Sequence, residues 1–498
     1  MQRMKWKKNL LGYLLWICFC ITVCTALVTA GVQILDRVGI TAPWTVAVMA
    51  VLFAAEAGLF FWLYPDKRKR QEEKEKKHGW TKYLPEFVAG VLLIALRFAA
   101  AMAYGMSPVG DTTLYEMAEI AGMESVPLLP HNASYVYACL LSVLLRFLGN
   151  KWTAVAVMQI LLQLVASFLF FAVVRKLYGR CASVAFLLLA SVMPDFLFRY
   201  NRITPDLLLG VLAGMILWTA AEIWNGIGEG KGWKCGFFSI LTGLLLGIFV
   251  WLDLSGLLLG LAVLLGITQL QNTCGVRRKG IFAGCVTVGL FGALSGAFLV
   301  ESQMTGIRFF DVLFYYIRPY IADLRLVVPQ TEELFSLIAT VMLCLLAGMA
   351  VVGFLKQDYE KTLIAAVMLS GITVLRYFNM TQVSYMNLEN LFWMLAVCAG
   401  ISCLADAYAE NPGVETALSE NLDAETAHTE NTGEMKKEKE TTEVTEQKQA
   451  SEGNYIPNPL PLPKKHVKRE IRFDYEPLPE QMDFDYELKK GEEDFDIL

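Results

Sequence analysis

Long apolar runs, separated by short polar segments, dominate the first 406 residues of the chain. A helix needs roughly 20 apolar residues to cross a membrane. Twelve runs have this character and are predicted to span the membrane: 10–34, 45–64, 83–104, 153–174, 181–198, 207–224, 235–252, 254–270, 281–300, 334–355, 361–378 and 387–406. The pattern therefore predicts an all-α polytopic membrane protein with about 12 transmembrane helices.

One further run, residues 134–149, is short for a span and contains Arg146. Basic clusters decide its placement, because cytoplasmic loops are enriched in Lys and Arg. If 134–149 does not span, the clusters at 67–77, 175–180 and 277–279 all lie in the cytoplasm. We therefore predict an interfacial or re-entrant helix on the outer side, and a multi-pass protein of the cell membrane with both termini cytoplasmic.

Composition supports the membrane class. The chain is 55% hydrophobic and 18% charged, whereas soluble proteins average about 25% charged residues, so a soluble enzyme is excluded. The run at 10–34 is too long for a signal peptide and is interpreted as an uncleaved first membrane helix. The eleven cysteines contain no CxxC pair and most lie in apolar runs. A disulfide framework or a zinc site is therefore not expected.

The net charge of −5 hides a division into a body with +7 and a tail, residues 407–498, with −12. Residues 407–453 lack the apolar residues that a core needs, so they are predicted to be disordered. In residues 455–498, FDYE recurs at 473–476 and 484–487, and FDI follows at 495–497. This repeat favours a docking segment for a cytoplasmic protein partner over plain solvated sequence. No basic tract indicates nucleic-acid binding.

Three outer segments, 105–133, 199–206 and 301–333, are brought to one face by this topology. The first two carry a set of polar residues: Asp111, Tyr115 and His131 in the first, and Arg199, Arg202 and Asp206 in the second. Arginine forks bind phosphate well, and a carboxylate can act as a general base on a hydroxyl. Helix capping explains Asp111 and Asp206 equally simply, and snorkelling at the membrane surface explains the arginines.

Four other charged residues have a structural interpretation as well as a functional one. Glu56 lies mid-span and should face a partner helix or be protonated, because a carboxylate facing lipid is costly. Asp253 stands at a helix end, where capping is the simpler explanation. Arg97 could snorkel or form an ion pair. The stretch 307–325 is predicted to be an interfacial helix, on which Arg318 could line an entrance for a lipid phosphate.

The order of these residues resembles the GT-C superfamily of membrane glycosyltransferases, specifically the bacterial protein-mannosyltransferase-like and aminoarabinose-transferase-like branches. The residues that carry the resemblance are Arg97, Asp111, Tyr115, His131, the basic turn 175–180, Arg202 and Asp206. The resemblance covers residues 83–225 well and 226–406 only as a general helix pattern. It divides the chain into two additional helices (1–82), a GT-C-like body (83–406) and the tail (407–498).

The resemblance implies transfer of a sugar from a polyprenyl-phosphate-linked donor to a cell-envelope acceptor on the outer face. Asp111 would be the catalytic base. The substrate-binding residues would be Arg97, Tyr115, His131, Arg199, Arg202, Asp206 and Arg318. No protein metal site is predicted, although a divalent metal remains possible as a cofactor. Thr112 replaces the family's frequent acidic residue and His131-Asn132-Ala133 replaces His-Pro-Pro, which argues against protein O-mannosylation in particular.

Two alternatives stay open. A transporter or lipid flippase would carry buried charges along a path and paired internal repeats. The chain has isolated charges at Glu56 and Arg97 but no clear repeat. The second alternative is a catalytically inert membrane scaffold, in contact with membrane lipids, that recruits partners through residues 455–498. It would explain the tail but assigns no role to the polar outer residues.

Overall fold

A computed structural model describes the greater part of the first 409 residues. The described residues are 10–39, 45–63, 83–106, 114–116, 118, 133–149, 152–228, 232–269, 276–322, 324–329, 334–356, 359–380 and 385–409. The chain divides into a unit of residues 1–420 and a second unit of residues 421–498. The predicted tail disorder and the FDYE repeats lie outside the described residues.

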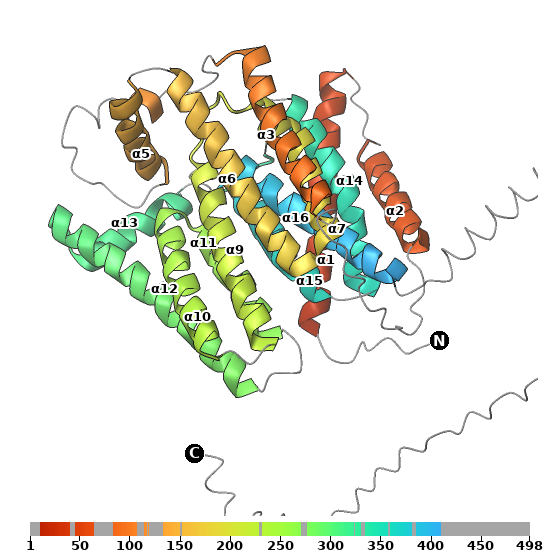
Figure 1. Cartoon of the computed structure of the whole chain (residues 1–498). Helices are drawn as coiled ribbons and strands as arrows, with labels where there is room; N and C mark the ends of the chain where they lie inside the picture. The colour runs from red at the N-terminus through yellow and green to blue at the C-terminus, as the bar shows by residue number, and fades with distance from the viewer. Residues whose placement is uncertain are drawn as a thin grey trace, which may run out of the picture. The chain divides into compact units, whose positions relative to one another are not determined.

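The described residues form helices and no strand (Figure 1). The helices of the first half are α1 (Leu10–Arg37), α2 (Thr45–Leu63), α3 (Leu84–Tyr104), α5 (Ala133–Leu148), α6 (Trp152–Tyr178), α7 (Arg180–Val192), α8 (Pro194–Phe198) and α9 (Asp206–Gly228). The helices of the second half are α10 (Gly232–Leu252), α11 (Ser255–Gln269), α12 (Val276–Thr305), α13 (Phe309–Ala322), α14 (Leu334–Lys356), α15 (Tyr359–Tyr377) and α16 (Met386–Ala409).

Eight of the described helices are long and apolar enough to cross a membrane, namely α1, α3, α6, α9, α10, α12, α14 and α16. The prediction of an all-α, multi-pass membrane protein is therefore confirmed in its coarse form. Every predicted span contains a helix, but the number that cross stays a prediction. The predicted span at 181–198 is divided into α7 and α8, because Met193 is extended and Pro194 starts a separate short helix. Proline lacks the backbone donor that continuous helix would need.

Helix α5 corresponds to the ambiguous run 134–149. Its buried side chains recur at helical spacing and form one hydrophobic cluster with Ile203. These side chains are Tyr137, Ala138, Leu141 and Leu145. The other side exposes Leu140, Val143 and Phe147. One face therefore packs on the protein, as an interfacial helix requires, and its position relative to a membrane stays a prediction.

The basic turn at 175–180 is tied to the ends of neighbouring helices. Glu86, in the first turn of α3, lies 3.4 Å from Arg175 and 3.6 Å from Arg180. Lys176 pairs with Glu222 of α9. The start of α3, the end of α6 and the start of α7 thus meet at one end of the bundle, which we call the basic end.

Helix α16 is the most buried of the spans and contacts α6, α7, α9, α14 and α15. Helix α1 packs against α14 and α15, and the Trp16 indole donates a hydrogen bond to the Val351 carbonyl (3.2 Å). Glu56 of α2 faces α14, since a Cβ built on Gly348 would lie 3.6 Å from its carboxyl carbon. The prediction that Glu56 faces a partner helix is confirmed.

Helices α10 and α12 approach each other closely through glycines. A Cβ built on Gly243 would lie 2.3 Å from the Val286 carbonyl oxygen, and one on Gly289 would lie 2.7 Å from the Ile240 carbonyl oxygen. Small residues let helix backbones approach in this way inside membranes, where dispersion forces hold helices together. The fit of α12 on α10 therefore depends on the absence of a side chain at these two positions.

Gly243→Ala is expected to destabilise the protein by about 1–3 kcal/mol, because the added methyl group must push two backbones apart. Gly236→Ala on the same helix is the matched control, since nothing lies within 4 Å of its added Cβ. The control should be neutral or stabilising, because alanine favours helix over glycine by about 1 kcal/mol. Thermal unfolding of both variants in detergent measures the contrast, and equal shifts would contradict the close approach.

Candidate functional site

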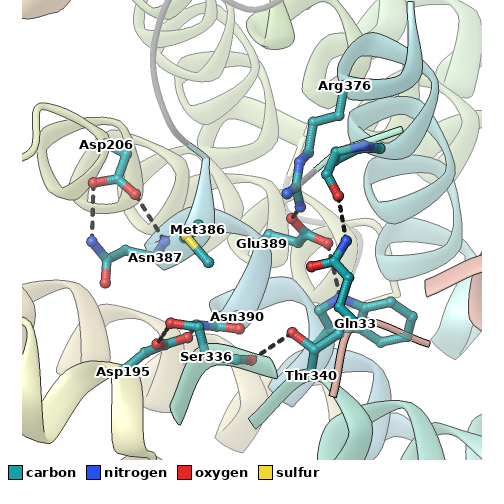
Figure 2. A network of polar contacts seen from close by, with 12 residues as sticks. Gln33, Asp195, Asp206, Ser336, Thr340, Arg376, Met386, Asn387, Glu389 and Asn390 are labelled. Carbon is teal, nitrogen blue, oxygen red and sulfur yellow. Dashed lines mark hydrogen bonds and ion pairs between the residues drawn. The ribbon is translucent and has the colours of Figure 1, made fainter. Parts of the chain in front are cut away.

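The start of α16 gathers a buried polar network from four other parts of the chain (Figure 2). Its first turn carries Met386, Asn387, Glu389 and Asn390, and each side chain reaches a different element. Leu388, among these residues, and Leu391, directly after them, are buried in the apolar core. One side of the first turn of α16 therefore packs in the core, and its other side chains contact polar or charged groups.

Asp206 binds the start of α16 directly. Its Oδ2 accepts a hydrogen bond from the backbone N–H of Asn387 (2.8 Å), and its Oδ1 accepts one from the Asn387 side-chain amide (3.0 Å). The same amide lies 3.3 Å from the Thr204 hydroxyl. Free N–H groups and the helix dipole favour a carboxylate at this position. Asp206 thus starts α9 and also satisfies the N-terminus of α16.

Asp195 forms the second contact of the network. Its Oδ2 accepts a hydrogen bond from the Asn390 amide at 2.6 Å, and its other oxygen accepts one from the Ser336 hydroxyl. Asp195 lies in the short helix α8, which the break at Pro194 turns away from the line of α7. The break therefore places a carboxylate that a continuous helix would have directed elsewhere.

Glu389 forms the third contact, an ion pair with Arg376 of α15. It also accepts a hydrogen bond from the Trp393 indole (3.3 Å). Both charged side chains line a cavity of about 50 Å³ between α1, α14, α15 and α16, large enough for about one or two water molecules. The cavity's other polar lining residues are Thr29, Gln33, Thr340, Thr373, Tyr377 and Asn390.

A fourth carboxylate, Asp253, lies between α10 and α11. Its Oδ1 accepts hydrogen bonds from the Ser255 backbone N–H (2.8 Å) and from the hydroxyl of Tyr385 (2.7 Å), the residue before α16. Burial raises the pKa of the Asp253 carboxyl, and hydrogen bonds from Ser255 and Tyr385 oppose this shift. The bond to Ser255 confirms the predicted helix-capping role, and the bond to Tyr385 connects it to the network.

The structure brings one of the two loop arginines, Arg199, beside these acids. Arg199 is buried and its Nη1 lies 2.8 Å from the Met386 sulfur. Its positive charge interacts with the Asp206 carboxylate. Arg202 is half-buried, three residues further along the same loop. Snorkelling is wrong for Arg199, because its side chain is turned into the protein.

Arg97 is almost fully buried in α3, with 1% of its surface exposed. One Nη donates to the Ala190 carbonyl (2.6 Å), and the guanidinium lies 4.9 Å from the Phe196 ring centroid. Its Nε and second Nη have no hydrogen-bond partner within the described chain. Snorkelling is wrong here too, and the site retains unused donor capacity for an anion.

The described residues before Asp111 contact the loop that carries Arg199 and Arg202, and those after it pack against a hydrophobic cluster that includes Ile203 of this loop. The hydroxyl of Tyr200 donates to the Gly105 carbonyl (2.6 Å). Downstream, Tyr115 stacks on Trp152 with centroids 4.3 Å apart and packs with Ile203 in one cluster. Asp111 and His131 themselves lie outside the described residues.

Arg318 is separate from the network. It is exposed on α13, whereas Tyr316 and Tyr320 of that helix are buried. No described contact brings it to the start of α16, so a place beside Asp206 is not observed.

The sequence interpretation missed Asp195, Ser336, Arg376 and the polar residues of α16. The available signal was the segment MNLEN at 386–390, which interrupts apolar sequence with three polar side chains at the start of a span. Polar residues inside membrane segments are costly and pair with one another. Their partners come from residues at least 130 positions away in most cases, so the sequence alone did not identify the pairs.

The described residues contain no group of three or more His, Cys, Asp or Glu side chains arranged to hold a metal ion. The three carboxylates nearest α16 each use hydrogen bonds or an arginine instead. The carboxylates of the network are therefore occupied by amide, hydroxyl and guanidinium donors. No protein-family model matches the sequence, and comparison with the curated proteins finds no match.

Proposed function

We propose that the protein is a GT-C-like glycosyltransferase of the cell membrane, which moves a sugar from a polyprenyl-phosphate donor to a cell-envelope acceptor on the outer face. The termini and the tail would be cytoplasmic. Asp111 would act as the base and the arginines near α16 would hold the donor phosphate. His131 would contribute to substrate binding from the same segment.

One observation carries the proposal, namely that the described residue before Asp111 is hydrogen-bonded to the loop bearing Arg199 and Arg202, while the described residue after it packs against a hydrophobic cluster that includes Ile203 of that loop. Gly105 is held by Tyr200, and Tyr115 packs in the cluster of Ile203. This supports a carboxylate and two guanidinium groups acting on one substrate. Sugar transfer from a lipid phosphate needs a base that takes the proton of the acceptor hydroxyl. It also needs cations that bind the phosphate of the leaving group.

The unused hydrogen-bond donors of the buried Arg97 give further support. Arg97 is buried with donors to spare, and a buried cation without an anion is unfavourable. Asp206 and Asp195 already accept hydrogen bonds from amides or a hydroxyl. A phosphate group is the kind of ligand that would use the remaining donors of Arg97.

The test is turnover by the purified full chain in lipid nanodiscs. Polyprenyl-phosphate donors with radiolabelled hexoses or aminoarabinose are supplied together with an envelope extract as acceptor, and released polyprenyl phosphate is measured. We expect release with at least one donor and an acceptor that becomes labelled. Donor that moves between leaflets without release would support a flippase, and neither binding nor release with any donor would support an inert scaffold.

A further inference from the structure

Helix α13 presents two different apolar stripes. Val312, Tyr316 and Tyr320 recur every four residues and are buried. A second stripe, with members three or four residues apart, is exposed and contains Phe310, Phe314, Ile317 and Ile321. Residues three or four apart lie on one side of a helix. The helix is thus bound to the protein along one side and bare along another.

The buried stripe fixes α13 to the ends of neighbouring helices. The Tyr316 hydroxyl donates to the Val250 carbonyl of α10, and the Tyr320 hydroxyl accepts a hydrogen bond from the Leu254 backbone N–H (3.3 Å). Phe298 of α12 packs against Tyr316 with ring centroids 5.3 Å apart. These contacts hold the helix in one rotation, so the bare stripe faces outward as a fixed surface.

Exposed apolar side chains also follow the helix in the sequence. On α13, Phe310 is 78% exposed and Phe314 is 64% exposed. In the segment 324–328, Leu326 is 75% exposed, and the Val327 backbone N–H donates to the Tyr377 carbonyl of α15 (2.8 Å). We call α13 with residues 324–328 the α13 surface. Exposed apolar area of this kind marks an interaction site.

Positive charges border the α13 surface. Arg308, Arg318 and Arg325 are all exposed, as is Asp311. A second acid, Asp323, lies outside the described residues. An amphipathic helix with apolar side chains on one side and basic residues beside them is typical of insertion at a membrane interface. Guanidinium groups bind phosphate through two parallel hydrogen bonds. Apolar side chains for acyl tails therefore stand next to cations for headgroup phosphates.

We propose that the α13 surface binds anionic phospholipids of the membrane leaflet. Phe310, Phe314, Ile317 and Ile321 lie among the acyl chains, and the three arginines bind the headgroup phosphates. The proposal rests on the exposure of the α13 surface and on the arginines in and beside it, and is independent of sugar transfer. It gives Arg318 a role in lipid binding instead of one in the network around α16.

The test uses the full chain with the photoreactive residue p-benzoylphenylalanine in place of Phe314. The protein is placed in nanodiscs with equal amounts of phosphatidylglycerol and phosphatidylcholine, irradiated, and the attached lipids are identified by mass spectrometry. We expect lipid adducts enriched in phosphatidylglycerol. Changing all three arginines to Gln should lower that enrichment at least about fivefold, since each cation near an anionic surface contributes about that factor.

The matched control removes three basic residues at the other ends of α10 and α12, by changing Lys234, Arg278 and Lys279 to Gln. It should leave the enrichment at position 314 unchanged. Adducts to a second protein copy in place of lipid would overturn the proposal. Equal capture of phosphatidylglycerol and phosphatidylcholine at position 314, with all three arginines present, would overturn it as well. Displacement of phosphatidylglycerol by an equimolar polyprenyl phosphate would also overturn it, and would assign the surface to a lipid-linked substrate.

Discussion

Asn387→Leu is expected to lower the free energy of unfolding by about 3 kcal/mol, because it removes a side-chain donor from a buried carboxylate. Asp206 is fully buried and accepts from both the backbone and the side chain of Asn387. Leucine has a similar size, so packing changes little, while one carboxylate oxygen loses its amide partner. Reversible unfolding in mixed detergent micelles measures the loss.

A double-mutant cycle separates the lost hydrogen bond from lost packing. Asp206→Leu with Asn387→Leu removes both partners, and such a pair of changes costs much less than the sum of the single changes. Asn225→Leu, at an exposed position of α9, is the control for adding leucine and should be nearly neutral. If the single changes simply add, Asp206 and Asn387 do not stabilise each other.

The sequence predicted the helices because apolar runs and helix length follow directly from the membrane. It also predicted that 134–149 would differ from a span, and α5 has the buried and exposed sides that this implies. It did not predict the break at Pro194. Local propensity weakens a helix at proline, but whether the chain continues depends on neighbours such as Ser336, whose hydroxyl donates a hydrogen bond to Asp195.

Individual site residues were recognisable, but their arrangement was not. Asp206, Arg199 and Arg202 stood out as charges beside apolar sequence. The actual partner of Asp206 is Asn387, which is 181 positions away, and an asparagine at the start of a span has no distinctive pattern. Pairing of distant polar groups is decided by how helices pack, which periodicity does not encode. Arg376 and Glu389 are only 13 positions apart, but they belong to two helices, α15 and α16, so their contact also depends on how the helices pack.

Asp111→Asn is expected to reduce sugar transfer by about 10²- to 10⁴-fold, the usual contribution of a general base. Asparagine keeps the size and can still hydrogen-bond, but it cannot take the proton of an acceptor hydroxyl. The turnover rate should therefore fall while the dissociation constant for the lipid-linked donor stays unchanged. Single-turnover rates and donor binding in nanodiscs measure the two quantities separately.

Glu116→Gln provides the matched control, since Glu116 is an exposed carboxylate in the same outer segment, beside the anchored Tyr115. The control should transfer sugar at the original rate, and the unfolding midpoint of both variants should match that of the unaltered protein. Full activity of Asp111→Asn would reject Asp111 as the base. Weakened donor binding with an unchanged turnover rate would instead assign it to donor recognition, next to the arginines of the loop. A specific loss of turnover, with fold and donor binding intact, is the one pattern that base catalysis by Asp111 predicts.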